Sequence, residues 1–193
     1  MSEFTPEELF DTIDRQVADL LARFGIDSPP VDALALVQEA FGYSVREEEP
    51  DDEPRQYGDR PRARPRGRQL VFQPTHSDAA KQSLAARACA KEMIPAILSK
   101  LGVVPGTEQK SAQGQLVGLI APRLLLPTRW FATAARRGNS DLLRLRETFP
   151  DVALELIALR LLDRFDNGVG QSVCLVDRAL RSERHVELLE DQV

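Results

Sequence analysis

Apolar residues near the N-terminus recur at intervals of three and four, which is the spacing of amphipathic helices. The first stripe consists of Leu9, Phe10, Ile13, Val17, Leu20, Leu21 and Phe24. Thr5, Pro6 and Glu8 precede it as an N-cap, a first-turn proline and a capping-box glutamate, and Gly25 follows it as a residue that tolerates positive φ. A shorter apolar stripe precedes Gly42. The pattern therefore predicts two helices, ending at Gly25 and Gly42.

Two short segments, 43–45 and 69–73, alternate between apolar and polar side chains, as strands do. We expect them to pair in a small sheet. Between them, an acidic run over 47–53 is followed by arginines at alternate positions from Arg60 to Arg68, with proline and glycine between. This composition buries too little apolar surface to offset the entropy of ordering, so a mobile charged loop is predicted at about 47–68. The neighbouring carboxylates are the expected partners of these arginines, in preference to phosphate.

A long helix is predicted over 79–101, with Ser77 and Asp78 at its N-terminus. Its expected core positions are Leu84, Ala88, Met93, Ile97 and Leu101. Pro95 lies inside this helix, where proline removes one backbone hydrogen bond and clashes with the carbonyl of Lys91, at roughly 3 kcal/mol or more. We therefore expect the helix to kink or break near Ile94.

Four further helices are predicted in the remaining sequence: 111–126, 127–138, 142–148, and one that starts at Pro150 and Asp151 and continues to Phe165. The last has apolar residues on more than one face, which predicts heavy burial. A final strand is expected over 172–176. The predicted fold is α+β and predominantly helical, with one domain over 1–177 and a charged tail over 178–193.

The composition fits one soluble domain, because 193 residues with 42% hydrophobic content bury one substantial core. Thirty acidic and 25 basic residues give a net charge of −5, which repels a phosphate backbone and makes nucleic acid an unlikely partner. The N-terminus is acidic and no apolar run approaches the roughly 20 residues of a membrane span. A cytoplasmic protein that does not enter a membrane is therefore predicted.

The few residues that commonly bind metals or react as thiols are scattered. Cys89 and Cys174 are far apart and are interpreted as buried small hydrophobic residues. His76 and His185 each lack a second ligand at helical or hairpin spacing, so surface positions are expected. No cofactor is predicted.

Two stretches of the chain resemble a known family. The first stretch consists of Ile120, Ala121, Pro122, Arg123, Leu124, Leu125, Leu126 and Pro127. It is similar to the segment Phe-Ala-Ala-x-Leu-Leu-Met-Pro of the ImmA/IrrE zinc metallopeptidases. The proline pair Pro29 and Pro30, followed by Gly42 and a strand, resembles the opening of the same family. The resemblance covers roughly 28–165 and implies a zincin-like helical domain with a small β-sheet.

The resemblance also locates the family's metal site, and the metal ligands are missing there. Residues 90–95 read Ala-Lys-Glu-Met-Ile-Pro, where the family has Ala-His-Glu-x-x-His. Lys91, Pro95 and Gly114 then occupy the three ligand positions, and only Glu92 remains, at the position of the general base. A protonated lysine has no lone pair, proline has no donor atom and glycine has no side chain. No metal is therefore expected, and Glu92 has no metal-bound water to deprotonate.

Lys91 allows one further hypothesis, in which its ammonium group fills the vacated metal position and pairs with Glu92 or a nearby carboxylate. Adjacent helical residues point about 100° apart, so this pairing would require the Pro95 kink to redirect them. A solvated lysine is the favoured alternative.

The resemblance implies a catalytically inactive, peptidase-like domain that binds a protein or peptide as a regulatory module in a bacterial-type cell. One alternative is a DNA-associated transcriptional regulator that uses the helix pair 142–165, with Arg144, Arg146 and Arg160 as phosphate contacts. The second helix of that pair begins with acidic and apolar residues, which favours core packing over base readout. A divergent active peptidase using Glu92, Arg87 and Lys91 is the other alternative. The sequence leaves open the partner, the oligomeric state and whether a groove near Glu92 is open.

Overall fold

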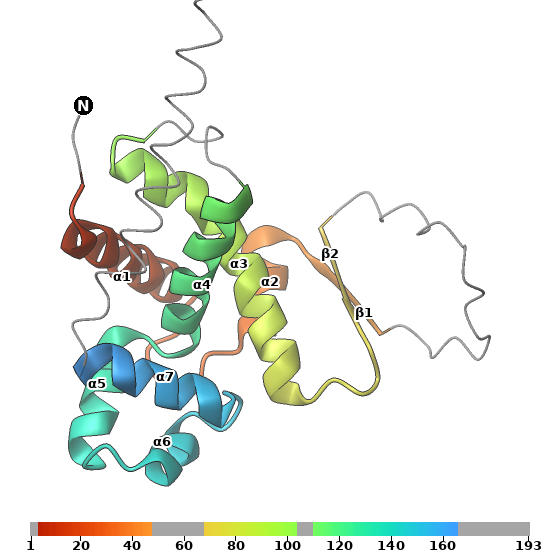
Figure 1. Cartoon of the computed structure of the whole chain (residues 1–193). Helices are drawn as coiled ribbons and strands as arrows, with labels where there is room; N and C mark the ends of the chain where they lie inside the picture. The colour runs from red at the N-terminus through yellow and green to blue at the C-terminus, as the bar shows by residue number, and fades with distance from the viewer. Residues whose placement is uncertain (1–3, 48–67, 104–109, 166–193) are drawn as a thin grey trace, which may run out of the picture.

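The computed structural model describes residues 4–47, 68–103 and 110–165, which form seven helices and one two-stranded sheet (Figure 1). The elements are α1 (Pro6–Arg23), α2 (Ala33–Phe41), β1 (Ser44–Glu47), β2 (Gln69–Phe72), α3 (Asp78–Lys100), α4 (Lys110–Leu125), α5 (Thr128–Arg137), α6 (Leu142–Thr148) and α7 (Leu154–Phe165). The predominantly helical α+β class is confirmed. The charged loop predicted at about 47–68 lies almost wholly outside the described residues, as do the predicted strand over 172–176, the domain end at 177 and the tail over 178–193.

The helix termini follow the local signals in the sequence. The Thr5 hydroxyl accepts the Glu8 N–H at 3.2 Å, and the Glu8 carboxylate accepts the Thr5 N–H at 2.7 Å, which completes the predicted capping box of α1. Gly25 and Gly42 both have φ of +68°, a backbone conformation that glycine adopts without steric cost. The predicted ends of α1 and α2 are therefore confirmed.

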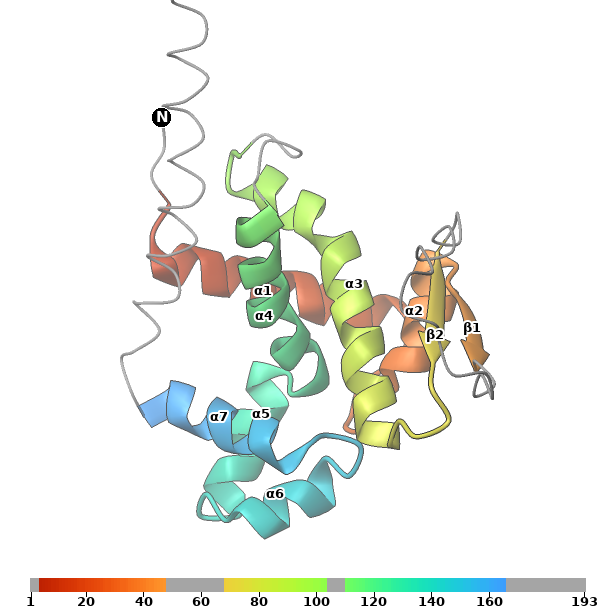
Figure 2. The ribbon, with the colours of Figure 1, turned by 45° about the vertical axis from the view of Figure 1, so that its right-hand side comes forward.

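Helix α3 is the centre of the molecule. It packs most extensively against α4 and α2, and Figure 2 shows α2 and the sheet on one side of α3, α4 on the other, and α1 passing behind α4 and α3. Small side chains fill its buried middle: Ala85, Ala86, Ala88, Cys89 and Ala90. These residues let the neighbouring helices approach closely, and larger residues of α4 such as Leu116, Ile120 and Leu124 complete the core.

Helix α3 also corrects two expectations. It is continuous from Asp78 to Lys100, so the break, one of the two outcomes expected near Ile94, does not occur. Pro95 is exposed, whereas Ile94 and Ile97 beside it are buried, and their packing against the core holds the helix on both sides of the proline. Leu84, expected in the core, is 38% exposed. The buried stripe instead follows the alanines.

The two strands pair in parallel, with Ser44 opposite Gln69 and Glu47 opposite Phe72. The predicted pairing of the two segments is confirmed. A parallel pair requires a long crossover connection, and the segment 48–68 has that length. Every residue of β1 is exposed, whereas Phe72 of β2 is buried, so β2 joins the sheet to the helical core.

The remaining helices α5, α6 and α7 lie together at the lower end of the molecule in Figures 1 and 2. The segment expected to start the last helix, at Pro150 and Asp151, forms a turn, and α7 begins at Leu154. The prediction of burial on several faces is wrong, because Leu159 and Leu162 are 59% and 60% exposed. Within the described residues, the buried side chains of α7, such as Ile157 and Arg160, lie on one face of the helix.

Two sets of polar contacts join segments that are distant in sequence. The Gln82 side chain of α3 accepts the Ala33 N–H at 2.7 Å and donates to the Asp32 carboxylate at 3.0 Å, so it supports the N-terminus of α2. The Thr128 hydroxyl donates to Asp14 of α1 at 2.9 Å and accepts a hydrogen bond from Arg160 of α7 at 2.6 Å. Among the described helices, none is long and apolar enough to cross a membrane.

Candidate functional site

The residues at the inferred ligand positions lie on α3 and α4, the two helices that pack together most extensively. Lys91 and Pro95 are one helical turn apart on the exposed side of α3. Gly114 is an exposed residue of α4, and a Cβ built there would meet no atom within 4 Å. The three positions therefore face solvent and offer no lone pair to a metal.

Glu92, which the resemblance aligns with the general base of the ImmA/IrrE family, is flanked by two hydrogen-bond donors. The Tyr43 hydroxyl donates to its Oε1 at 2.9 Å, and Arg68 Nη2 donates to its Oε2 at 2.7 Å. Arg68 Nη1 also donates to the Phe41 carbonyl at 2.9 Å, which fixes the guanidinium between α2 and α3. Both carboxylate oxygens are thus engaged, and the Glu92 side chain is only 22% exposed.

Neither Tyr43 nor Arg68 was identified as a site residue from the sequence. Arg68 is the last arginine of the run that was expected to pair with neighbouring carboxylates, and its partner is instead Glu92 on α3. Tyr43 and Glu92 are 49 positions apart. No local pattern could have predicted either contact, because both depend on how α2 and the sheet dock onto α3.

The environment of Tyr43 keeps its phenol protonated. Burial raises the pKa of Tyr43 above its usual value, and the hydrogen bond to Glu92 raises the pKa further. At neutral pH the hydroxyl therefore remains a donor to Glu92, which stabilises the arrangement around that carboxylate.

Lys91 does not occupy the position of a metal. Its side chain is exposed, and within residues 4–47, 68–103 and 110–165 no hydrogen bond or ion pair of its ammonium group is found. The cation beside Glu92 is Arg68. The solvated lysine that we favoured is therefore confirmed.

Other metal-ligating residues are also dispersed in the described part of the chain, where no three His, Cys, Asp or Glu residues come together. His76 is partly buried, and its Nδ1 accepts the Gln73 N–H at 3.2 Å while its ring packs edge-on against Phe72. Cys89 is fully buried, as expected, and burial raises the pKa of its thiol to about 12. Cys174 and His185 lie outside the described residues.

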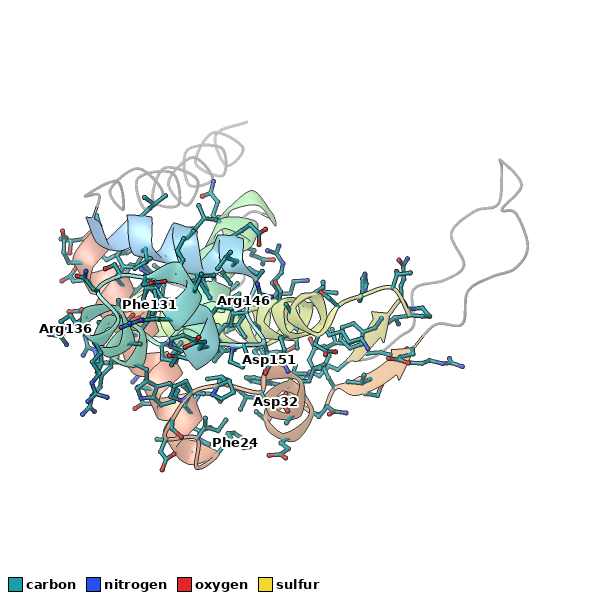
Figure 3. All side chains as sticks on the ribbon, turned by 90° about the horizontal axis from the view of Figure 1, so that it is seen from below. Phe24, Asp32, Phe131, Arg136, Arg146 and Asp151 are labelled. Carbon is teal, nitrogen blue, oxygen red and sulfur yellow. The ribbon has the colours of Figure 1, made fainter. Side chains whose placement is uncertain are left out.

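A cleft of about 700 Å³ lies between α5, α6 and the turn that follows α1. Its lining residues are Asp27, Pro29, Arg129, Trp130, Thr133, Ala134, Arg137, Gly138, Arg144, Glu147 and Thr148. Helix α5 positions this lining because it turns Phe131 into the core and its arginines outward, as the labels of Phe131 and Arg136 in Figure 3 show. Sequence reasoning missed this cleft because three separate segments form it.

The connection between α5 and α6 contributes Gly138 to the lining of the cleft. Asn139 and Ser140 have φ of +52° and +59°, a region that non-glycine residues rarely adopt and that costs of order 1–3 kcal/mol each. The Ser140 N–H donates to the Ala135 carbonyl at 2.8 Å, and the Asp141 carboxylate accepts the Leu143 N–H at 2.8 Å. These bonds hold the turn and fix α6 beside α5.

Comparison of the chain with protein-family models, with curated proteins and with solved structures gives no significant match.

Proposed function

We propose that this chain is a catalytically inactive, zincin-like domain that binds a protein or peptide as a regulatory module. The observation that supports the proposal best is the engagement of Glu92 by Tyr43 and Arg68. A general base acts from within hydrogen-bond reach of the proton that it removes. Glu92 is held by a hydrogen bond from Tyr43 and an ion pair with Arg68, so part of the accepting capacity of each oxygen is already used within its own chain.

The chemistry of the surrounding positions agrees with this interpretation. A zinc peptidase acidifies a water molecule through a metal held by three side chains. None of the side chains at the three aligned ligand positions coordinates a divalent ion: Lys91 is a cation, Pro95 is a saturated ring and Gly114 has only a hydrogen atom. Without catalysis, the function of the domain is to bind a partner at its surface.

A binding role is supported by the cleft beside α5 and α6, because its volume of about 700 Å³ falls within the range of typical binding sites. Its lining does not include Glu92 or the two partners of Glu92, and it combines an indole ring with several charged side chains. Such a combination is typical of surfaces that bind proteins.

The alternative of DNA binding through α6 and α7 has less support. Arg160, one of the three expected phosphate contacts, is only 8% exposed and donates to Thr128 inside the protein. The exposed residues of α7 include Leu159 and Leu162, which offer no hydrogen bonds to base edges or phosphates. Arg144 and Arg146 alone provide a small phosphate-binding surface.

Two measurements on the purified full chain test the proposal: zinc content and hydrolysis of an internally quenched peptide library. We expect zinc far below one ion per chain and no hydrolysis above buffer. The Glu92→Gln variant should lose only stability, by about 1–2 kcal/mol, because it weakens a charge-assisted hydrogen bond. Glu39→Gln, an exposed residue of α2, is the matched control and should be neutral. One zinc per chain together with hydrolysis that Glu92→Gln abolishes would favour a divergent active peptidase.

A further inference from the structure

We infer that the cleft between α5, α6 and the turn after α1 binds an acidic peptide segment that carries a large apolar side chain beside its carboxylates. The inference rests on the proposed protein-binding function and specifies the chemistry of the partner. Its support comes from the charge around the cleft, the geometry of the arginines, the position of the tryptophan and the two acidic residues of the lining.

The charge around the cleft is opposite in sign to that of the whole chain. Residues 128–148, which form α5, α6 and their connection, contain five arginines and two acidic residues, a net charge of +3. The whole chain carries −5, which leaves −8 for the remainder. A local basic surface on an acidic protein attracts an acidic segment of limited length and repels a long polyanion.

The arginines converge on the cleft from two helices. Arg129 and Arg137 are two turns apart on the same face of α5, with Thr133 between them, and Arg144 approaches from α6. All three arginines are exposed, and across the described segments their guanidinium groups make no ion pair or side-chain hydrogen bond. A guanidinium group binds a carboxylate through two parallel N–H donors, so three of them favour a ligand with several carboxylates.

Trp130 adds an apolar surface to the same cleft. It is the only tryptophan in the chain, it is partly buried, and Pro29 and Ala134 lie in the same lining. Tryptophan and arginine are the residues that most often dominate the energy of protein interfaces. An aromatic or aliphatic side chain of the partner fits against this ring, next to carboxylates that reach the arginines.

Two acidic residues in the lining favour a peptide over nucleic acid. Asp27 and Glu147 line the cleft together with the arginines. A phosphate backbone presents only negative charge and acceptors to them, so its binding would be opposed. A peptide backbone supplies N–H donors that satisfy carboxylates while its acidic side chains bind the arginines.

Fluorescence of Trp130 in the full chain tests the inference directly. The probe is a blocked eight-residue peptide of glutamates around one phenylalanine, and its comparators are the same peptide with glutamine for glutamate and a 12-base-pair DNA duplex. We expect a saturable fluorescence change with the acidic peptide, at an affinity about tenfold or more above that for the glutamine peptide, and a decrease in affinity with salt. Calorimetry of the same titrations provides a measurement independent of the fluorophore.

Substitutions of arginines inside and outside the cleft test whether the acidic peptide binds there. Arg137→Gln combined with Arg144→Gln should weaken binding of the acidic peptide about tenfold or more, because two guanidinium contacts are lost. Arg46→Gln, an exposed arginine of β1 outside the cleft, should leave the affinity unchanged. Circular dichroism of each variant excludes unfolding as the cause.

The possible outcomes separate this inference from the proposed function. Equal affinity for the acidic and glutamine peptides would overturn the acidic partner and leave a peptide-binding domain in place. Binding of the acidic peptide that the cleft double variant retains in full would overturn the site. Tighter binding of the DNA duplex than of the acidic peptide, or no binding of either peptide by calorimetry, would overturn the inference. The zinc and hydrolysis measurements test separately whether the domain is catalytically inactive.

Discussion

At the residue scale, Cys89 shows how burial determines chemistry. Its side chain is fully buried in the middle of α3, and its Sγ lies 4.0 Å from the Ala33 carbonyl. Burial is the largest cause that raises the pKa of this thiol, from 9.0 to about 12, because the thiolate would lose its hydration. A thiol reacts as its thiolate, so Cys89 is a structural residue and is not expected to act as a nucleophile.

We therefore predict that Cys89 is protected from alkylation in the folded protein. In a Cys174→Ser variant at pH 8, iodoacetamide should modify the native chain at least about 100-fold more slowly than the urea-unfolded chain, since the thiolate is depleted roughly 1,000-fold and is buried as well. Mass spectrometry over time measures both rates, and Cys89→Ser serves as the control that reports on Cys174. Equal rates in the folded and unfolded chains would contradict the prediction.

The same shift in pKa gives an expected pH dependence of stability. Because the pKa of Cys89 is higher in the folded chain, the unfolded thiol ionises first as the pH rises above about 9. The contribution of this thiol to stability is present in full below that pH and is lost between about 9 and 12. The Cys89→Ala variant should show a smaller loss of stability over this interval.

At the element scale, α3 is a helix that tolerates an internal proline. Pro95 cannot donate to the Lys91 carbonyl, yet the helix continues for five further residues to Lys100. The proline ring faces solvent, while Ile97 and Leu98 on the following turn are fully buried. Packing of both halves of α3 against α2 and α4 therefore outweighs the lost hydrogen bond.

It follows that Pro95→Ala should stabilise the protein. Restoring the backbone N–H and removing the clash is expected to raise the free energy of unfolding by about 1–3 kcal/mol. Equilibrium unfolding in urea measures the change. Pro6→Ala is the matched control and should give no gain, because a proline at the first helical position loses no intrahelical hydrogen bond. A loss of stability in Pro95→Ala would mean that the packing of α3 depends on the proline.

At the scale of the whole molecule, polar side chains join the helices, and two of these side chains, Arg123 and Arg160, are buried. Thr128 lies between Asp14 of α1 and Arg160 of α7, with hydrogen bonds of 2.9 and 2.6 Å. Arg123 of α4 lies 3.5 Å from the same Asp14 carboxylate, and its guanidinium packs over the Phe10 ring at 4.1 Å. One hydroxyl and one carboxylate thereby connect α1, α4, α5 and α7.

Thr128→Val tests this connection without a change in side-chain size. The variant removes an acceptor from the buried Arg160, so we expect a loss of about 1–3 kcal/mol in the free energy of unfolding by urea titration. Thr133→Val is the matched control, because the Thr133 hydroxyl bonds only to a carbonyl of its own helix, that of Arg129. Equal losses in the free energy of unfolding for the two variants would show that the hydrogen bond to Arg160 stabilises the protein no more than a hydrogen bond within one helix does.

The sequence by itself determined the local features: the helix termini at Thr5, Gly25 and Gly42, and the two segments that form strands. Capping and periodicity act between residues three or four positions apart, which is why these features could be predicted. The resemblance to the ImmA/IrrE family, and the inactive peptidase that it implies, stay predictions.

Only the tertiary structure decided the partners of Glu92, the one-sided burial of α7, the continuity of α3 and the existence of the cleft. Tyr43 and Arg68 lie 49 and 24 positions from Glu92, and the cleft joins residues from Asp27 to Thr148. Such contacts depend on the way whole helices pack. The free energy of that packing is a sum over residues that are distant in sequence, so a local sequence pattern cannot predict it.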